Sequence, residues 1–365
     1  MPDTVPEMSL AVELAERGFV PDPVLRIAIR QLVRRRLAEE AAREAHAPAG
    51  VVPAFVEELR RSPVALVPDL ANRQHYEVPA RLFELALGRR LKYSACWWPP
   101  GVSTLDDAEE RMLALTAERA GLADGQRVLD LGCGWGSLSL WIAERFPASR
   151  VLAVSNSKPQ RELILARAAR LGLANVDVRT ADANDFDPGE RFDRILSIEL
   201  FEHLRNYERF LGRVAGWLEP AGRLFVHVFC HARYAYPFDA GEGGSNDWMA
   251  RNFFTGGLMP SRDLLLHFQR DLVVEASWTL SGDHYQRTAE AWLANLDARR
   301  AEAEALFVGT HGVAGARRAV QRWRMFFLAC AELFGHHGGS EWGIAHYRFA
   351  RASTRAPMQR AEEAG

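Results

Sequence analysis

The sequence has few cysteines for its length, and they lie far apart. Cys96, Cys133, Cys230 and Cys330 are the 4 cysteines among 365 residues. None of them forms the close pair that a zinc knuckle or a redox motif requires. We therefore expect reduced thiols, no metal site and a cytoplasmic protein.

An excess of charge of one sign and long hydrophobic runs are also missing. Lys and Arg total 45 against 47 for Asp and Glu, so the formal net charge is -2 and no global positive field argues for a nucleic acid partner. The apolar stretch from Val24 to Leu37 is interrupted by five arginines, which excludes a signal-peptide core or a membrane span there. These arginines are Arg26, Arg30, Arg34, Arg35 and Arg36.

What the sequence does contain is enough apolar material for a full core. The apolar share is 48%, and the length suits one α/β catalytic domain with extra helices. Residues 1–90 predict a helical extension with breaks at Pro21, at Pro23 and across 45–53. In it, Leu25, Ile29, Leu32 and Val33 share one face opposite the arginines, a pattern found in membrane-interfacial helices and in helices that dock on a protein. Docking is the favoured interpretation.

From residue 127 onward, short apolar runs alternate with amphipathic helices. Strands are predicted at 127–131, 150–154, 176–179, 192–198 and 223–229, and helices at 137–146, 159–171 and 207–218. This alternation predicts a mostly parallel sheet covered on both faces. We assign residues 91–351 to the catalytic domain and 352–365 to a flexible tail.

The long irregular stretch from Cys230 to Pro260 is rich in aromatics and glycine. Loops of this length in a compact domain are commonly lids or substrate-binding elements. A strand at 273–280, helices at 288–307 and 314–334, and a closing strand at 342–349 are predicted after it. We therefore expect a substrate-binding insertion at about 230–340.

The strongest local motif is the glycine-rich turn after the first predicted strand. The residues 128–136 read Val-Leu-Asp-Leu-Gly-Cys-Gly-Trp-Gly, with glycines at positions 132, 134 and 136. Dinucleotide sites use Gly-x-Gly-x-x-Gly to seat a pyrophosphate on a helix N-terminus, and this spacing differs. S-adenosylmethionine, which has no phosphate, is compatible with the shorter spacing.

Polar residues follow several successive strands of the predicted sheet. They are the glycine turn 132–136, Asn156, Asp182, Glu199, and the pair Cys230 and His231. Ligands of open α/β sheets bind at the carboxyl ends of the strands. The sequence therefore predicts one ligand site at this edge.

At this point the chain resembles the cyclopropane fatty acid synthase superfamily, and within it the coclaurine N-methyltransferase type, from about His75 to Phe349. The motifs that carry the resemblance are 75–79 (HYEVP), 91–97 (LKYSACW), the glycine turn, 198–203 (IELFEH), 278–288 (WTLSGDHYQRT) and 332–335 (ELFG). The resemblance implies a class I methyltransferase with a Rossmann-like, mostly parallel seven-stranded sheet. It also implies S-adenosylmethionine as cofactor and S-adenosylhomocysteine as product.

The resemblance assigns a set of cofactor-binding residues. Asp130 would meet the ammonium group of the cofactor, Asn156 and Gln160 the ribose, and Asp182 with Ala183 the adenine. Simpler roles for Asp130 and Asp182 are a turn-capping and a solvated loop aspartate. The full set is Tyr93, Ser94, Asp130, Gly132, Gly134, Gly136, Asn156, Gln160, Asp182 and Ala183.

A few positions favour an amine over a lipid as the methyl acceptor. In cyclopropane synthases, the resemblance implies a bicarbonate held by a Cys, a Glu, a His and a Tyr. In this sequence Ala95 stands at the position of the Cys, and Met325 or Phe326 at the position of the Tyr. The Glu and the His are present as Glu202 and His227. We predict a small-molecule amine substrate. The alternatives are an unsaturated lipid, with membrane contact only in that case, and a catalytically silent cofactor-binding protein.

The N-methyltransferase pattern carries the catalytic role to Glu199, Glu202 and His203. An imidazole titrates near working pH, so His203 suits a base that a carboxylate orients. The alternative is that Glu202 and His203 only cap the helix after the fourth strand. Aromatic and polar side chains are candidates for the acceptor pocket, although such aromatics are more often plain core. These substrate candidates are Trp97, Trp98, His231, Tyr234, Trp248, Phe253, His284 and Tyr285. The oligomeric state stays open, a homodimer being one option.

Overall fold

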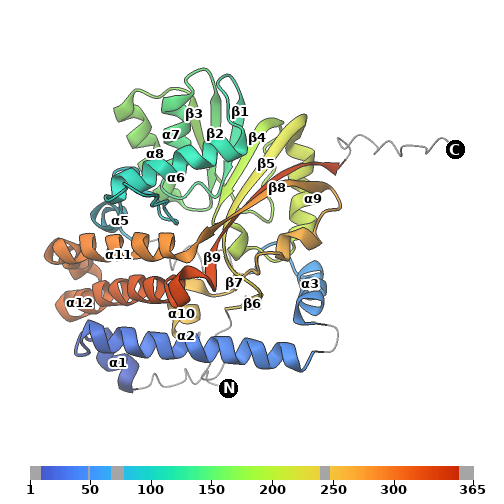
Figure 1. Cartoon of the computed structure of the whole chain (residues 1–365). Coiled ribbons are helices and arrows are strands. Elements are labelled where there is room, and N and C mark those ends of the chain that lie inside the picture. The colour runs from blue at the N-terminus through green and yellow to red at the C-terminus, as the bar shows by residue number, and fades with distance from the viewer. Residues whose placement is uncertain (1–9, 48–49, 67–77, 239–246, 353–365) are drawn as a thin grey trace, which may run out of the picture.

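The computed structural model describes residues 10–47, 50–66, 78–238 and 247–352, and it is built on one seven-stranded sheet. The strand order is β3-β2-β1-β4-β5-β9-β8, and all neighbours pair in parallel except β9, which is antiparallel to β5 and β8 (Figure 1). The bounds are β1 Arg127–Leu131, β2 Arg150–Ser155, β3 Val176–Thr180, β4 Phe192–Ile198, β5 Leu218–His231, β8 Leu272–Ser281 and β9 Trp342–Arg351. This confirms the predicted mostly parallel α/β sheet.

Apolar side chains cover both faces of the sheet. In β1, Val128 and Leu129 are both fully buried, and they belong to two different core clusters. Successive side chains of a strand point to opposite faces, so a strand buried on both sides reads as a continuous apolar run. The helices that supply the cover are α6 Leu105–Ala120, α7 Ser137–Arg145, α8 Lys158–Leu171 and α9 Tyr207–Trp217.

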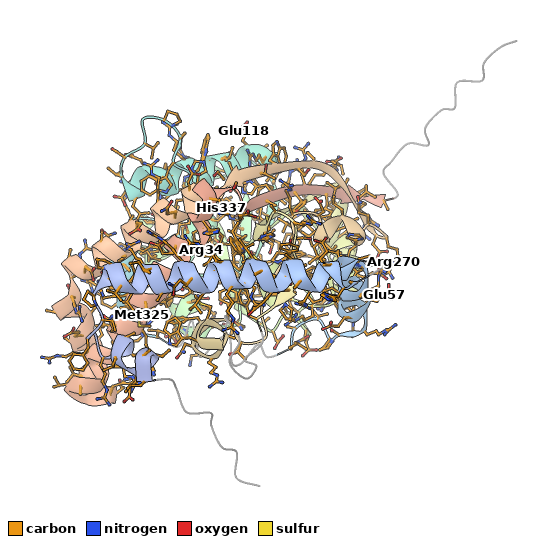
Figure 2. The ribbon with its side chains drawn as sticks, turned by 60° about the horizontal axis from the view of Figure 1, so that its bottom comes forward. Arg34, Glu57, Glu118, Arg270, Met325 and His337 are labelled. Carbon is orange, nitrogen blue, oxygen red and sulfur yellow. The ribbon has the colours of Figure 1, made fainter. Side chains whose placement is uncertain are left out.

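A second helical group lies at the end of the sheet where the site forms. It consists of α1 Leu10–Glu16, α2 Asp22–Ala45, α5 Ala80–Ala86, α11 Gly282–Ala298 and α12 Arg300–Phe334, with α3 Val51–Arg61 beside α9. Figure 2 shows α2 crossing the whole face, with Met325 near one end and Arg270 near the other. No helix within the described ranges is long and apolar enough to cross a membrane.

Helix α2 docks on α12, and it does so partly through arginines. Arg26 binds Glu332 at 2.7 Å and Glu290 at 2.5 Å, and Arg30 also binds Glu332. Leu25 and Val33 are buried as predicted, whereas Leu32 is exposed. The predicted division into an apolar face and an arginine face was therefore wrong in part, because Arg26 and Arg30 have carboxylate partners on the protein side.

The predicted C-terminal helices were displaced along the chain. We expected helices at 288–307 and 314–334, but α11 starts at Gly282 and ends before Arg299, and α12 begins at Arg300 with a non-helical kink at Gly312 (φ 66°). The apolar periodicity continues through the break, so it does not mark the boundary.

Short elements occupy the predicted irregular stretch. They are the β6 Tyr236–Pro237 and β7 Leu258–Met259 pair, α10 Asp247–Met249 and a π-helical turn at Ala250–Phe254, followed by a 3-10 turn at Leu264–His267. A further 3-10 turn, His336–Gly339, precedes β9. The predicted motif residues His75, Tyr76 and Glu77, and the predicted tail after Ala352, lie outside the described residues.

We expect Glu332→Gln to lower the free energy of unfolding by about 2 kcal/mol, because Arg26 would lose a charged partner inside a mostly buried contact. Denaturant titration followed by fluorescence measures this. Glu302→Gln is the matched control, because its ion pair with Arg81 is half exposed on both sides and should contribute less than about 0.5 kcal/mol. Equal losses in the two variants would contradict the docking role of Glu332.

Candidate active site

A cavity of about 180 Å³ opens at the carboxyl ends of β1, β2 and β4. One wall is the loop 91–94 that precedes α6, and another is the segment 254–256 after the π-helical turn. Helices α11 and α12 contribute Tyr285, Trp292 and Phe326 from a third side. Parallel strands bring their following loops to one edge, which explains why residues distant in the sequence meet there.

The glycine turn after β1 forms the floor of the cavity. Gly132, Gly134 and Gly136 have φ values of 76°, 52° and 78°, a region that side chains rarely adopt. A Cβ atom on Gly136 would lie 2.6 Å from Ile164, so glycine allows the turn to pack on α8. At Gly134 no atom lies within 4 Å of the Cβ position, and the space belongs to the cavity.

Several buried polar groups of this floor lack a partner among the residues that the structure describes. The Gln160 amide nitrogen, the Ser137 hydroxyl and the Trp135 ring nitrogen are all in this state, and all three residues line the cavity. Asp130 is 1% exposed, accepts a hydrogen bond from Ser139, and has its pKa raised to about 6 by burial. Unsatisfied buried polar groups are costly, so this donor and acceptor set fits a bound polar ligand such as an adenosyl amino acid.

Glu199 lines the same cavity, directly after β4, which pairs with β1. One carboxylate oxygen, Oε1, accepts from the Ala95 amide at 2.9 Å and from His227 Nε2 at 3.2 Å. The other, Oε2, accepts from the Tyr285 hydroxyl at 2.8 Å. Burial raises the pKa of Glu199, and the charge of Lys92 opposes that rise. The residue has a φ of 50°, and such strained backbone often accompanies a functional position.

His203 lines the same end of the cavity, at the end of the 3-10 turn Phe201–His203. Its ring stacks on Phe254, with ring centroids 4.9 Å apart and an interplanar angle of 17°. Burial lowers the pKa of His203 to about 4, against the opposing charge of Glu199. The imidazole is therefore neutral near pH 7, and the prediction that it titrates near working pH was wrong, because burial disfavours its charged form.

Glu202 is on the same turn but points away from the cavity. Its Oε1 accepts from the Phe229 amide at 2.7 Å, and the side chain is fully buried. Burial and the nearby charge of Glu199 raise the pKa of Glu202 well above its ordinary value. Its hydrogen bond to Phe229 ties this turn to β5, and Glu202 is not among the residues that line the cavity.

The family model described as mycolic acid cyclopropane synthetase matches residues 68–339. The chain belongs to this family. It is 37% identical over 353 residues to (S)-coclaurine N-methyltransferase of Thalictrum flavum subsp. glaucum, covering 95% of this chain and 97% of that protein. The match to the cyclopropane-fatty-acyl-phospholipid synthase of Escherichia coli (strain K12) is 28% over 225 residues, 61% of this chain and 55% of that protein.

Among solved structures, the chain resembles a crystal structure of coclaurine N-methyltransferase bound to N-methylheliamine and SAH (S-adenosylhomocysteine). The TM-score is 0.88 at 36% identity, covering 93% of this chain and 98% of that one. This family member is accordingly an S-adenosylmethionine-dependent methyltransferase, and its relatives place it with the N-methyltransferases of small amines. Within the described ranges, no group of three or more His, Cys, Asp or Glu residues could hold a metal ion.

Most of the predicted cofactor residues of this methyltransferase line the cavity. Gly136 does not, and it packs on α8 instead. Asp182 does not either, because its carboxylate accepts from the Asn184 amide at 2.7 Å and caps the turn after β3. Those that line it are Tyr93, Ser94, Asp130, Gly132, Gly134, Asn156, Gln160 and Ala183.

Of the predicted substrate-binding residues, the cavity includes only Tyr285. The Trp98 ring nitrogen donates to Thr288 at 3.0 Å, and that of Trp248 donates to Glu16 at 3.0 Å. His231 accepts from two backbone amides, those of Arg233 and Tyr234, in a turn after β5. The residues outside the cavity lining are Trp97, Trp98, His231, Tyr234, Trp248, Phe253 and His284.

Sequence reasoning missed Lys92, Trp292 and Leu200 in the cavity wall. The Lys92 ammonium group is buried and donates to Ser94 Oγ and, at 2.7 Å, to the Ala95 carbonyl. Burial lowers its pKa. The position of Lys92 inside the motif 91–97 could have indicated its role, because a lysine among apolar residues is buried only when it has partners.

We expect Gly134→Val to abolish binding of S-adenosylhomocysteine, measured by calorimetry, because the side chain would fill the floor of the cavity. Gly172→Val is the matched control. Gly172 also has a positive φ (68°) and open space around its Cβ position, but it caps the far end of α8. The control should lose stability and keep its affinity. Unchanged affinity in Gly134→Val would remove this placement of the cofactor.

Proposed function

We propose that this methyltransferase acts on the nitrogen of a small, largely apolar cyclic amine, of the kind that its relatives' names print, such as coclaurine or pavine, and that Glu199 and His203 carry the reaction. The observation that supports this most is their arrangement. The buried carboxyl group of Glu199 and the neutral imidazole of His203 line the same cavity as the glycine turn.

The residues around the glycine turn would hold the cofactor. We assign Asp130 to its ammonium group, Asn156 and Gln160 to the ribose, and the backbone near Ala183 to the adenine. Tyr93 and Ser94 would close over the methionine end from the loop before α6. Bound S-adenosylmethionine supplies a methyl group on a positively charged sulfur, which is open to in-line attack by a nitrogen lone pair.

The part of the cavity beside Glu199 and His203 would receive the amine. An ammonium ion entering an apolar site gains from the Glu199 charge, which is weakly screened there. The neutral His203, whose basicity the Glu199 charge increases, then accepts the proton at an imidazole nitrogen, which frees the lone pair for attack. Phe254 and Phe326 also line the cavity, and aromatic rings attract a cation. Glu202 enters the proposal as support for β5, not as a group that touches the amine.

The contacts of Glu202 and His227 argue against the lipid alternative. These are the two residues that remain of the bicarbonate set of cyclopropane synthases. Here Glu202 Oε1 accepts a hydrogen bond from the Phe229 amide. Both ring nitrogens of His227 are hydrogen-bonded, one to Glu199 and the other to His346. With Ala95 and Met325 at the two remaining positions, no bicarbonate cradle is formed by these side chains.

The cellular location belongs to the same proposal. The cysteines Cys96, Cys133, Cys230 and Cys330 are all free and buried. Free thiols suit a reducing compartment. We therefore place the enzyme in the cytoplasm.

Release of S-adenosylhomocysteine by the purified protein tests the proposal. Secondary and tertiary amines, tetrahydroisoquinolines among them, are compared with vesicles of unsaturated phospholipid under the same conditions. We expect turnover with amines and none with vesicles. Turnover only with vesicles would overturn the amine assignment, and no turnover with either would overturn the enzymatic role.

We expect His203→Ala to lower kcat by about 10²-fold or more, the usual contribution of a positioned base, while its affinity for S-adenosylhomocysteine stays close to wild type. The control is His267→Ala, because His267 also ends a 3-10 turn but is exposed. Full activity in His203→Ala would refute the base assignment.

Comparing Glu199→Gln with Glu202→Gln distinguishes the roles of the two glutamates in the motif 198–203. Glu199→Gln keeps the shape of the side chain and removes the negative charge, so we expect kcat/KM for the amine to fall by about 10²-fold, as for a broken buried charge interaction. Glu202→Gln should lose at least about tenfold less, because a neutral amide oxygen still accepts from Phe229. Steady-state kinetics with one amine measure both variants, and a larger loss in Glu202→Gln would reverse the assignment.

A further inference from the structure

Two buried histidines lie side by side behind Glu199, and the strand register explains why. His227 of β5 pairs with His346 of β9, and His346 pairs in turn with Trp278 of β8. Residues opposite each other on neighbouring strands share one face of the sheet. The two histidines are 0% exposed, and Glu199 follows β4, whose last residue Ile198 pairs with His227.

These side chains form a continuous hydrogen-bonded chain that ends on an arginine. Arg119 of α6 contacts His346 Nδ1 at 2.8 Å, His346 Nε2 contacts His227 Nδ1 at 2.9 Å, and His227 Nε2 contacts Glu199 Oε1 at 3.2 Å. The Arg119 guanidinium lies over the Trp278 ring, 5.1 Å from its centroid. Arg119 is half-buried, so the chain connects the edge of the molecule with the cavity.

The chemistry of the four groups allows only one direction of donation. Burial lowers the pKa values of His227 and His346 far enough that both rings are neutral, each with one N–H. A guanidinium donates and never accepts, so His346 Nδ1 must be the acceptor and its Nε2 must carry the proton. The same step repeats at His227, whose Nε2–H then points at the Glu199 carboxylate. Each bond polarises the next in a medium of low dielectric.

We propose that Arg119, His346 and His227 are positioning residues that hold Glu199 as an oriented anion toward the cavity. This inference rests on the proposed role of Glu199 in binding the amine. Three donors bond the carboxylate, namely the Ala95 amide, the Tyr285 hydroxyl and His227 Nε2–H. Donors of this kind favour the charged form and offset the burial that raises the pKa of Glu199.

The direction of the effect follows from the groups that face Glu199. Lys92, His203 and the hydrogen-bond donors favour the anion, whereas burial disfavours it. Loss of the chain therefore raises the pKa of Glu199, and the acid limb of kcat/KM for the amine moves to higher pH. The titratable groups around Glu199 are Lys92, Cys96, Glu202, His203, His227, Tyr285 and Cys330.

The first test needs no activity. Nitrogen-15 NMR of the imidazoles in the purified full chain reports which ring nitrogen carries the proton, and single substitutions of His227 and His346 assign the signals. We expect Nε2–H on both rings in the wild type, and a changed tautomer population at His346 in Arg119→Met. A proton on Nδ1 of either ring in the wild type would overturn the proposal.

The second test is kinetic, and Arg348 offers a matched control. Arg348 also lies over Trp278, 5.9 Å from the ring centroid, but it contacts Glu275 and the Arg119 carbonyl instead of His346. We expect Arg119→Met to lower kcat/KM for the amine by about ten- to a hundredfold, the range for partners that orient a functional group from behind. The acid limb of the kcat/KM profile of Arg119→Met should move to higher pH. Arg119→Lys should restore part of the lost kcat/KM. Arg348→Met should have the kcat/KM and the pH profile of the wild type.

Affinity for S-adenosylhomocysteine should stay unchanged in all these variants, which shows that they fold. If Arg119→Met does not fold, His346→Leu replaces it, because leucine can neither donate to His227 nor accept from Arg119. The proposal would be overturned if Arg119→Met and Arg348→Met had the same dependence of kcat/KM on pH. Absence of wild-type turnover with amines would sink the proposed function alone, since the tautomer measurement still decides whether the chain exists.

Discussion

The architecture of the site depends on the burial of one carboxylate. Glu199 is held by groups from the loop before α6, from β5 and from α11, which are distant in the sequence. A buried charge is tolerated only when its oxygens are bonded, so these three segments are tied to the end of β4. The strained backbone of Glu199 is maintained by the same contacts.

The cavity combines two kinds of chemistry. Near the glycine turn, buried polar groups are left for a ligand to satisfy, as with Gln160 and Ser137. Around Glu199, both carboxylate oxygens are bonded by the protein. In our proposal, a neutral His203 accepts a proton and the charge of Glu199 attracts a cation.

The sheet and the part of the cavity beside the glycine turn were predictable because their signals are local. A buried parallel strand followed by Gly132 and Gly134, or by Asn156, places those residues at one edge whatever the helices do. The residues that line the rest of the cavity were harder to predict from the sequence. Trp98, Trp248 and Phe253 are aromatic like Phe254 and Phe326, and composition does not tell which aromatics face a cavity and which fill a core. The end of α11 at Ala298 was missed for a similar reason, since the apolar periodicity continues past it.

The histidine chain could not be predicted from the sequence at all. His227 and His346 are 119 residues apart, and only the antiparallel register of β5 and β9 brings them together. The same holds for Arg119 and Trp278, which meet because α6 covers that face of the sheet. Strand register depends on the packing of whole strands, so it cannot be predicted from any single residue.

The most direct test of this account is a crystal structure of the protein with S-adenosylhomocysteine and an N-methylated cyclic amine bound together. The account predicts the amine nitrogen between the Glu199 carboxylate and the His203 ring, facing the sulfur across the cavity. An amine bound elsewhere, with Glu199 and His203 left in contact only with the protein, would contradict it.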